Sequence, residues 1–145
     1  MKLIFALALS TYLAGSIGVH AQNAMSKDAI LAMGAYVPTD DMPSSEKFYR
    51  TLFDREPIIQ LNDFVAFDVA DGWFALVSRD TYAPDAVPGT GAVPYLQSGN
   101  LVALQARIAL AGGTVPAIIE EPGIHLLKIS DPNGQLIEFF MLTSR

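Results

Sequence analysis

The feature that most constrains this chain is a pattern of predicted secondary structure that occurs twice in succession. In the first half, an apolar run at 29–37 predicts a strand, and phenylalanine, tyrosine and leucine side chains spaced four apart predict a helix over 44–53. Three further strands are predicted at 57–61, 64–69 and 73–78, separated by Asn-Asp and Asp-Gly turns. The first half therefore has the order strand, helix and three strands.

The second half repeats this order. A strand is predicted at 93–96, followed by a helix at 101–111 that ends at a pair of glycines. Three strands follow at 115–119, 124–130 and 135–142. Each half thus has one helix and four strands.

Two alignments indicate that the halves arose by duplication. Residues 34–41 align with 93–100, and residues 71–76 align with 133–138. The second copy begins about 60 positions after the first, which is the fixed offset that an internal repeat produces.

The region 81–91 is predicted to be a linker between the halves, because three of its last four residues are glycine or proline. We predict one α+β domain over 29–143, built from two tandem strand–helix–strand–strand–strand modules at 29–80 and 91–143. This length suits one compact domain with its own core.

The N-terminal residues 1–21 have the layout of a secretory signal peptide. Lys2 precedes an apolar segment, and small residues end the stretch at Ala21. A periplasmic or secreted protein is therefore expected, with no membrane anchor after cleavage. A second cut after Ala24, a retained anchor and a true start at Met25 remain open.

The charge and cysteine count exclude several classes of function. The net charge is −6, and it becomes −7 once Lys2 is removed. The few basic side chains are scattered among acidic ones, so nucleic-acid binding is not expected. The chain has no cysteine, which excludes disulfides, thiolate metal sites and a cysteine nucleophile.

Two motifs at the separation set by the repeat carry a resemblance to a known family. The stretch 41–49, DMPSSEKFY, looks like a helix entry, and Asp131-Pro132-Asn133-Gly134 followed by Glu138 looks like a final hairpin. Together they resemble the vicinal oxygen chelate superfamily of glyoxalases, bleomycin-resistance proteins and ring-cleaving dioxygenases. The resemblance implies curved mixed sheets around a cavity, a small-molecule ligand and a homodimer.

The resemblance also implies where a metal would be bound. The positions that hold the ion in metal-dependent members correspond to Gly34, Leu76, Val93 and Glu138. Only Glu138 has a donor group, and one carboxylate does not retain a transition metal. We therefore expect no metal and no cofactor.

Aromatic side chains and one ion pair make up the predicted binding site. Tyr36 and Tyr95 each follow a lost ligand position by two residues, so strand alternation places both on the cavity face. Lys128 is predicted to lie opposite Glu138 and to offer a polar anchor. The predicted ligand-binding residues are Tyr36, Phe74, Tyr95, Lys128, Glu138 and Phe140.

Alternatives remain open at this point. The aromatic side chains could simply fill the core, and the Lys128–Glu138 pair could be a half-exposed surface pair. Trp73 is interpreted as a shield for a sheet edge. Alternation places His125 on the helix side of its strand or in the preceding loop, and a position facing the cavity stays open because strand ends fray.

The leading hypothesis is an exported protein that binds or sequesters a small, partly aromatic molecule without a metal. The acidic charge is compatible with a cationic ligand. The alternative hypothesis is an enzyme. It would be a glyoxalase-like lyase or isomerase that uses a metal, or a metal-free lyase, isomerase or other superfamily enzyme that uses Glu138 as a general base, with Lys128 or His125 as its partner. A third is an interaction module whose sheets support dimerisation.

Overall fold

The computed structural model describes residues 30–143, and the predicted signal peptide at 1–21 lies outside this range. The first module contains β1 (Ala35–Thr39), α1 (Met42–Phe53), β2 (Ile59–Gln60), β3 (Phe64–Val69) and β4 (Gly72–Ser78). The second contains β5 (Tyr95–Gln97), α3 (Leu101–Leu110), β6 (Ile119–Glu121), β7 (Ile124–Ser130) and β8 (Leu136–Leu142), and the short helix α2 (Arg79–Tyr82) lies between the modules.

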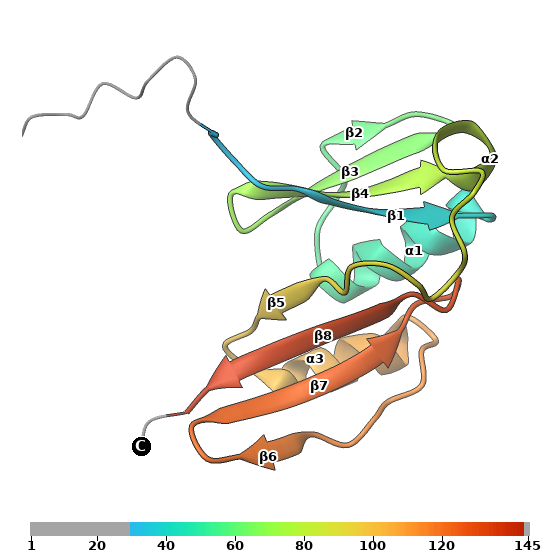
Figure 1. The fold of residues 1–145 in the computed structure, drawn as a ribbon. Helices are drawn as coiled ribbons and strands as arrows, with labels where there is room; N and C mark the ends of the chain where they lie inside the picture. Colours follow the sequence, from blue (N-terminus) through green and yellow to red (C-terminus); the bar gives the residue numbers. More distant parts are fainter. Residues whose placement is uncertain (1–29, 144–145) are drawn as a thin grey trace, which may run out of the picture.

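Each module forms its own four-stranded mixed sheet. The strand orders are β1-β4-β3-β2 and β5-β8-β7-β6, so the two sheets have the same topology. The first strand of each module pairs in parallel with the last, and the other pairs are antiparallel. The prediction of an α+β fold with two tandem modules is confirmed. Figure 1 shows both long helices on the same side of the two sheets.

The helices pack their apolar sides into one core shared by the modules. α1 buries Phe48, Tyr49 and Leu52, and α3 buries side chains at the same kind of spacing, including Leu104 and Ile108. These side chains belong to a single buried cluster with residues from both sheets. None of the helices formed by residues 30–143 has the length and apolar character needed to cross a bilayer.

Seven elements begin at positions that differ from the prediction, and the prediction of a strand at 115–119 was largely wrong, because β6 covers Ile119–Glu121. Two of the differences have a clear local reason. α1 starts at Met42 rather than residue 44, because the Asp41 side chain accepts a hydrogen bond from the Ser44 amide at 3.0 Å and caps the helix. β1 starts at Ala35 rather than residue 29, because its pairing with β4 begins at Ala35 opposite Phe74. Residues 30–34 form an exposed arm before the sheet.

The turn between β7 and β8 is held by the buried carboxylate of Asp131. Its Oδ1 accepts hydrogen bonds from the amides of Asn133 and Gln135, each at 2.8 Å. Its Oδ2 accepts a hydrogen bond from the hydroxyl of Tyr49 on α1, also at 2.8 Å. Burial, followed by the charge and hydrogen bond of Asp131, raises the pKa of Tyr49 well above its ordinary value.

The same turn makes a second contact with the first module through Asn133. Its amide nitrogen donates to the Ser45 hydroxyl at 2.9 Å, and its amide oxygen accepts from the Thr39 hydroxyl at 3.1 Å. Thr39 and Ser45 are buried and hydrogen-bonded to each other at 2.7 Å. Side chains of β1 and α1 therefore fix the last hairpin of the chain.

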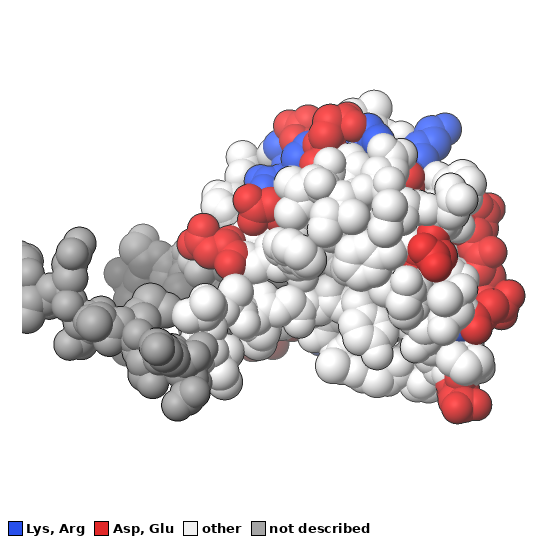
Figure 2. Space-filling view, turned by 90° about the horizontal axis from the view of Figure 1, so that it is seen from above, with Lys and Arg blue, Asp and Glu red and all other residues white. Residues whose placement is uncertain are grey.

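The charged side chains are unevenly distributed over the surface. Figure 2 shows a broad uncharged area across the middle of the molecule in that view, with acidic side chains gathered toward its margins. Part of the surface is therefore uncharged, although the chain has a net negative charge.

Candidate functional site

The face of the sheets that points away from the helices is called the open face here, and strand register decides which side chains occupy it. In the first sheet Tyr36 pairs with Ala75, while Val37 pairs with Leu76. Val37 and Leu76 are buried in the core, so alternation places Tyr36, Ala75 and Trp73 on the open face.

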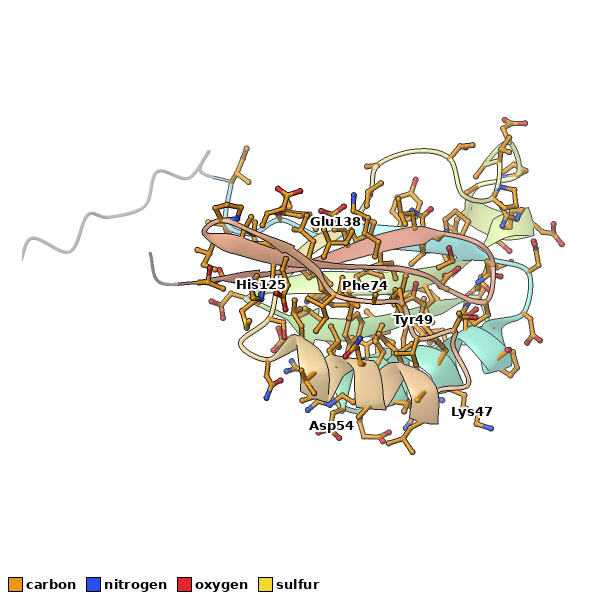
Figure 3. All side chains as sticks on the ribbon, turned by 90° about the horizontal axis from the view of Figure 1, so that it is seen from below. Lys47, Tyr49, Asp54, Phe74, His125 and Glu138 are labelled. Atoms are coloured by element: carbon orange, nitrogen blue, oxygen red, sulfur yellow. The ribbon has the colours of Figure 1, made fainter. Side chains whose placement is uncertain are left out.

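The prediction that Phe74 lies on the cavity face was wrong. Its side chain is 2 % exposed, and its ring packs against Tyr49 and Phe53 of α1 at centroid distances of 4.9 and 5.0 Å. Figure 3 shows Phe74 and Tyr49 between the sheets and the helices. Phe74 borders the cleft described below, but its ring belongs to the core.

In the second sheet, a row of three side chains crosses the open face. Tyr95 pairs with Glu138, and Glu138 pairs with Lys128. The Lys128 Nζ lies 3.1 Å from the Glu138 Oε2, as predicted, with side-chain exposures of 47 % and 17 %. In Figure 3 Glu138 projects from the side of the sheet opposite the helices. Because Lys128 is about half exposed, this is a surface ion pair.

The registers correct one of the predicted metal positions. Tyr36 and Tyr95 are equivalent, so the partner of Tyr36, Ala75, is the counterpart of Glu138. Leu76, which the sequence alignment placed there, is fully buried. The alignment was shifted by one because nine residues separate Lys128 from its partner Glu138, whereas eight separate Ala66 from its partner Ala75.

The corrected set of four positions does not fit a metal centre. Gly34, Ala75 and Val93 carry no donor atom, and the Glu138 carboxylate is engaged by Lys128. Within residues 30–143 no three His, Cys, Asp or Glu side chains are grouped so that they could hold a metal ion.

An open cleft of about 820 Å³ lies along the first strands of the two modules. The lining residues are 33–36, Pro38, Val69, Ala70, Trp73, Phe74, Ala86, 90–97 and Gln135. This volume is within the range of about 300–1,000 Å³ that small-molecule sites occupy.

Three aromatic side chains dominate the cleft. Tyr36, Trp73 and Tyr95 all line it and are 62 %, 51 % and 51 % exposed. The ring of Tyr95 stacks on Phe140, with a centroid distance of 4.4 Å and an interplanar angle of 13°. Phe140 does not line the cleft but supports a ring that does. Exposed rings held in this way are available to stack with a ligand.

Some of the residues that the sequence placed on the cavity face do line the cleft. Tyr36 and Tyr95 lie in the cleft as predicted, whereas Lys128 and Glu138 lie on the open face outside its lining. A general base at Glu138 would therefore act outside the cleft. Trp73 was missed as a cleft residue, although counting back two positions from a correctly aligned Ala75 would have found it.

His125 lies on the face of its sheet that is turned away from the cleft. It pairs with Glu120 and Met141, and it lies two residues before the buried Leu127 on β7, which places both side chains on the helix side. His125 does not line the cleft.

The sequence matches a family model over residues 29–139, the Glyoxalase/Bleomycin resistance protein/Dioxygenase superfamily. The chain belongs to this superfamily. A comparison with curated protein sequences gives no match. The superfamily fold is shared with many solved structures.

Three of these structures illustrate the range. An antibiotic binding protein from Streptomyces sp. CB03234 aligns with a TM-score of 0.67 and 19 % identity, covering 81 % of this chain and 100 % of its own. A family enzyme from Burkholderia phytofirmans PsJN aligns with a TM-score of 0.67 and 16 % identity, covering 79 % and 100 %. A lactoylglutathione lyase from Agrobacterium tumefaciens aligns with a TM-score of 0.59 and 22 % identity, covering 80 % and 95 %. At these identities the likeness establishes the fold alone.

Proposed function

We propose that this superfamily member binds or sequesters a small, partly aromatic molecule in the cleft, without a metal ion. The observation that carries the proposal is the exposure of Tyr36, Trp73 and Tyr95 in one cleft of about 820 Å³. Rings in a concave site bind planar ligands by stacking and by removing apolar surface from water. The existence of an antibiotic binding protein with the same fold is compatible with this use of the cleft.

We further propose that the protein acts outside the cytoplasm. The leader at 1–21 supports this, because it combines Lys2, an apolar segment and small residues before the cut. Mass spectrometry of periplasmic or culture material should find a mature N-terminus at Gln22. Recovery of a product that begins at Met1 would contradict export.

Binding can be followed directly, because Trp73 is the one tryptophan of the chain and lines the cleft. A library of small aromatic compounds is screened against the mature protein by thermal shift, since a ligand that binds the native state raises its unfolding temperature. Each hit is then titrated while the emission of Trp73 is recorded. Saturable quenching with a matching thermal shift is expected.

Matched variants locate the bound compound. Tyr36→Ser and Tyr95→Ser each remove a cleft ring and should weaken binding by about fivefold, on the order of 1 kcal/mol of stacking. Tyr82→Ser is the control, because Tyr82 is 52 % exposed like Tyr95 but lies outside the cleft lining. Equal affinities for all three variants would place binding elsewhere and contradict the proposal.

A further inference from the structure

The lining of the cleft is uncharged, although the chain as a whole is acidic. None of the residues that line it among 30–143 carries a charge, although the chain has 15 acidic side chains. Arg79 lines a small pocket that shares Gln135 with the cleft, and its guanidinium donates to the Asp40 carboxylate at 2.7 Å and to the Ala86 carbonyl oxygen at 2.6 Å. Glu138 follows Tyr95 in the row across the open face of the second sheet, and its carboxylate is paired with Lys128.

A charged ligand would therefore lose water in this cleft without gaining a partner of opposite charge. Such uncompensated desolvation costs far more free energy for an ion than for a neutral polar group. The negative charge of the whole chain attracts cations only over distances limited by salt. The lining therefore offers an anion no partner, and it offers a cation only the faces of the exposed rings, whose attraction is weak compared with the cost of removing the ion from water.

One polar side chain in the lining has a defined orientation. Gln135 is 8 % exposed, and its amide nitrogen donates to the carbonyl oxygens of Leu136 at 2.9 Å and Ala92 at 3.4 Å. Two carbonyl acceptors fix the nitrogen of the amide, so the oxygen is the atom left to receive a donor. Within residues 30–143 no donor is hydrogen-bonded to that oxygen.

We propose that the cleft selects uncharged, planar aromatic molecules that carry a hydrogen-bond donor, with the Gln135 amide oxygen as the acceptor. The exposed rings supply stacking, and Gln135 distinguishes ligands with a donor from those without one. This inference rests on the proposed function and names its ligand class. It replaces the cationic ligand that net charge alone suggests.

The test uses four naphthalene probes that differ in one substituent at the same ring position. Naphthamide is neutral and has a donor, methyl naphthoate is neutral without one, naphthoate is an anion, and naphthamidine is a cation at neutral pH. Affinities for the mature protein are measured by calorimetry. Naphthamide should bind at least about tenfold more tightly than either ion and severalfold more tightly than the ester.

Two glutamines of the cleft give a matched pair of variants. Gln135→Met should bind naphthamide and the ester equally, whereas Gln97→Met should keep the preference, because Gln97 lines the cleft but is exposed. The ranking of the four probes on the wild type tests charge selection even where Gln135→Met does not fold.

The outcomes separate the two proposals. If naphthoate or naphthamidine binds as tightly as naphthamide, and Tyr36→Ser weakens that binding, then the cleft is a ligand site and the inference is overturned. If affinities are unchanged in Tyr36→Ser, or none of the probes binds, both the inference and the proposed use of the cleft are contradicted.

Discussion

Replacing Tyr49 with phenylalanine tests the link between the two modules. The variant keeps the ring that packs against Phe48, Phe53 and Phe74 at centroid distances of 5.2, 5.5 and 4.9 Å. It removes only the hydroxyl that donates to the Asp131 Oδ2 at 2.8 Å. The loss of stability is therefore assigned to one hydrogen bond between α1 and the β7–β8 turn.

The magnitude follows from the burial of both partners. Tyr49 is fully buried and Asp131 is 5 % exposed, so water does not readily replace the hydroxyl. A hydrogen bond to a charged group contributes about 1.5–3 kcal/mol. Because Asp131 keeps the two backbone amides on its other oxygen, we expect Tyr49→Phe to lower the free energy of unfolding by about 2 kcal/mol.

The pKa of Tyr49 predicts how this difference depends on pH. The folded state holds the phenolic proton more tightly than the unfolded state, whose tyrosine pKa is about 10. The stabilisation is thus complete below about pH 10 and is lost as the pH rises above it, by up to about 1.4 kcal/mol per unit. Phenylalanine does not titrate, so the two proteins should converge in stability above about pH 10.

Urea unfolding across a pH series measures both effects. A loss of about 2 kcal/mol lowers the midpoint by about 1 M for a domain of this size. Tyr95→Phe is the control, because its ring is half exposed, and it should stay within about 0.5 kcal/mol of the wild type. Equal midpoints for wild type and Tyr49→Phe, or a constant difference up to high pH, would refute the reasoning.

Four further results are expected. Gly72→Ala should destabilise the fold by about 1 kcal/mol or more, because its Cβ would overlap the Met33 carbonyl oxygen, whereas Gly99→Ala, with nothing near its Cβ, should lie within about 0.5 kcal/mol of wild type in urea unfolding. Lys128→Met should change stability by less than about 1 kcal/mol, since it breaks a half-exposed pair with Glu138, and a larger loss would mean a buried pair. Elemental analysis after dialysis against a chelator should find no stoichiometric zinc, nickel, manganese or iron. Light scattering should give the mass of a homodimer, and a monomer at tens of micromolar would rule this out.

The arrangement of the fold was predictable because its signals are local and occur twice. β3 and β7 have the predicted bounds, 64–69 and 124–130, since each is an apolar run bounded by turn residues. The extent of β1 was not predictable in this way. Residues 30–34 are as apolar as the strand that follows, but a strand ends where its partner ends, and the partner is set by tertiary structure.

The turn between β3 and β4 decides which face of the sheet Trp73 and Phe74 occupy. The sequence suggested Asp71 and Gly72 as the turn residues, but Ala70 and Asp71 have φ values of 51° and 60°, and Gly72 already pairs with Val69. A one-residue shift exchanges the two faces of a strand. Alanine rarely adopts positive φ, so a turn at Ala70 was not predictable from the residue types.

The Asp131–Gly134 turn, whose sequence resembles that of the superfamily, links the second module to the first. Its carboxylate and amide side chains reach Tyr49, Ser45 and Thr39, which all belong to the other half of the duplication. A half expressed alone would leave these buried groups without acceptors or donors, and the cost of that would fall on both fragments. The turn therefore stabilises the association of the two modules, and this role does not depend on what the cleft binds.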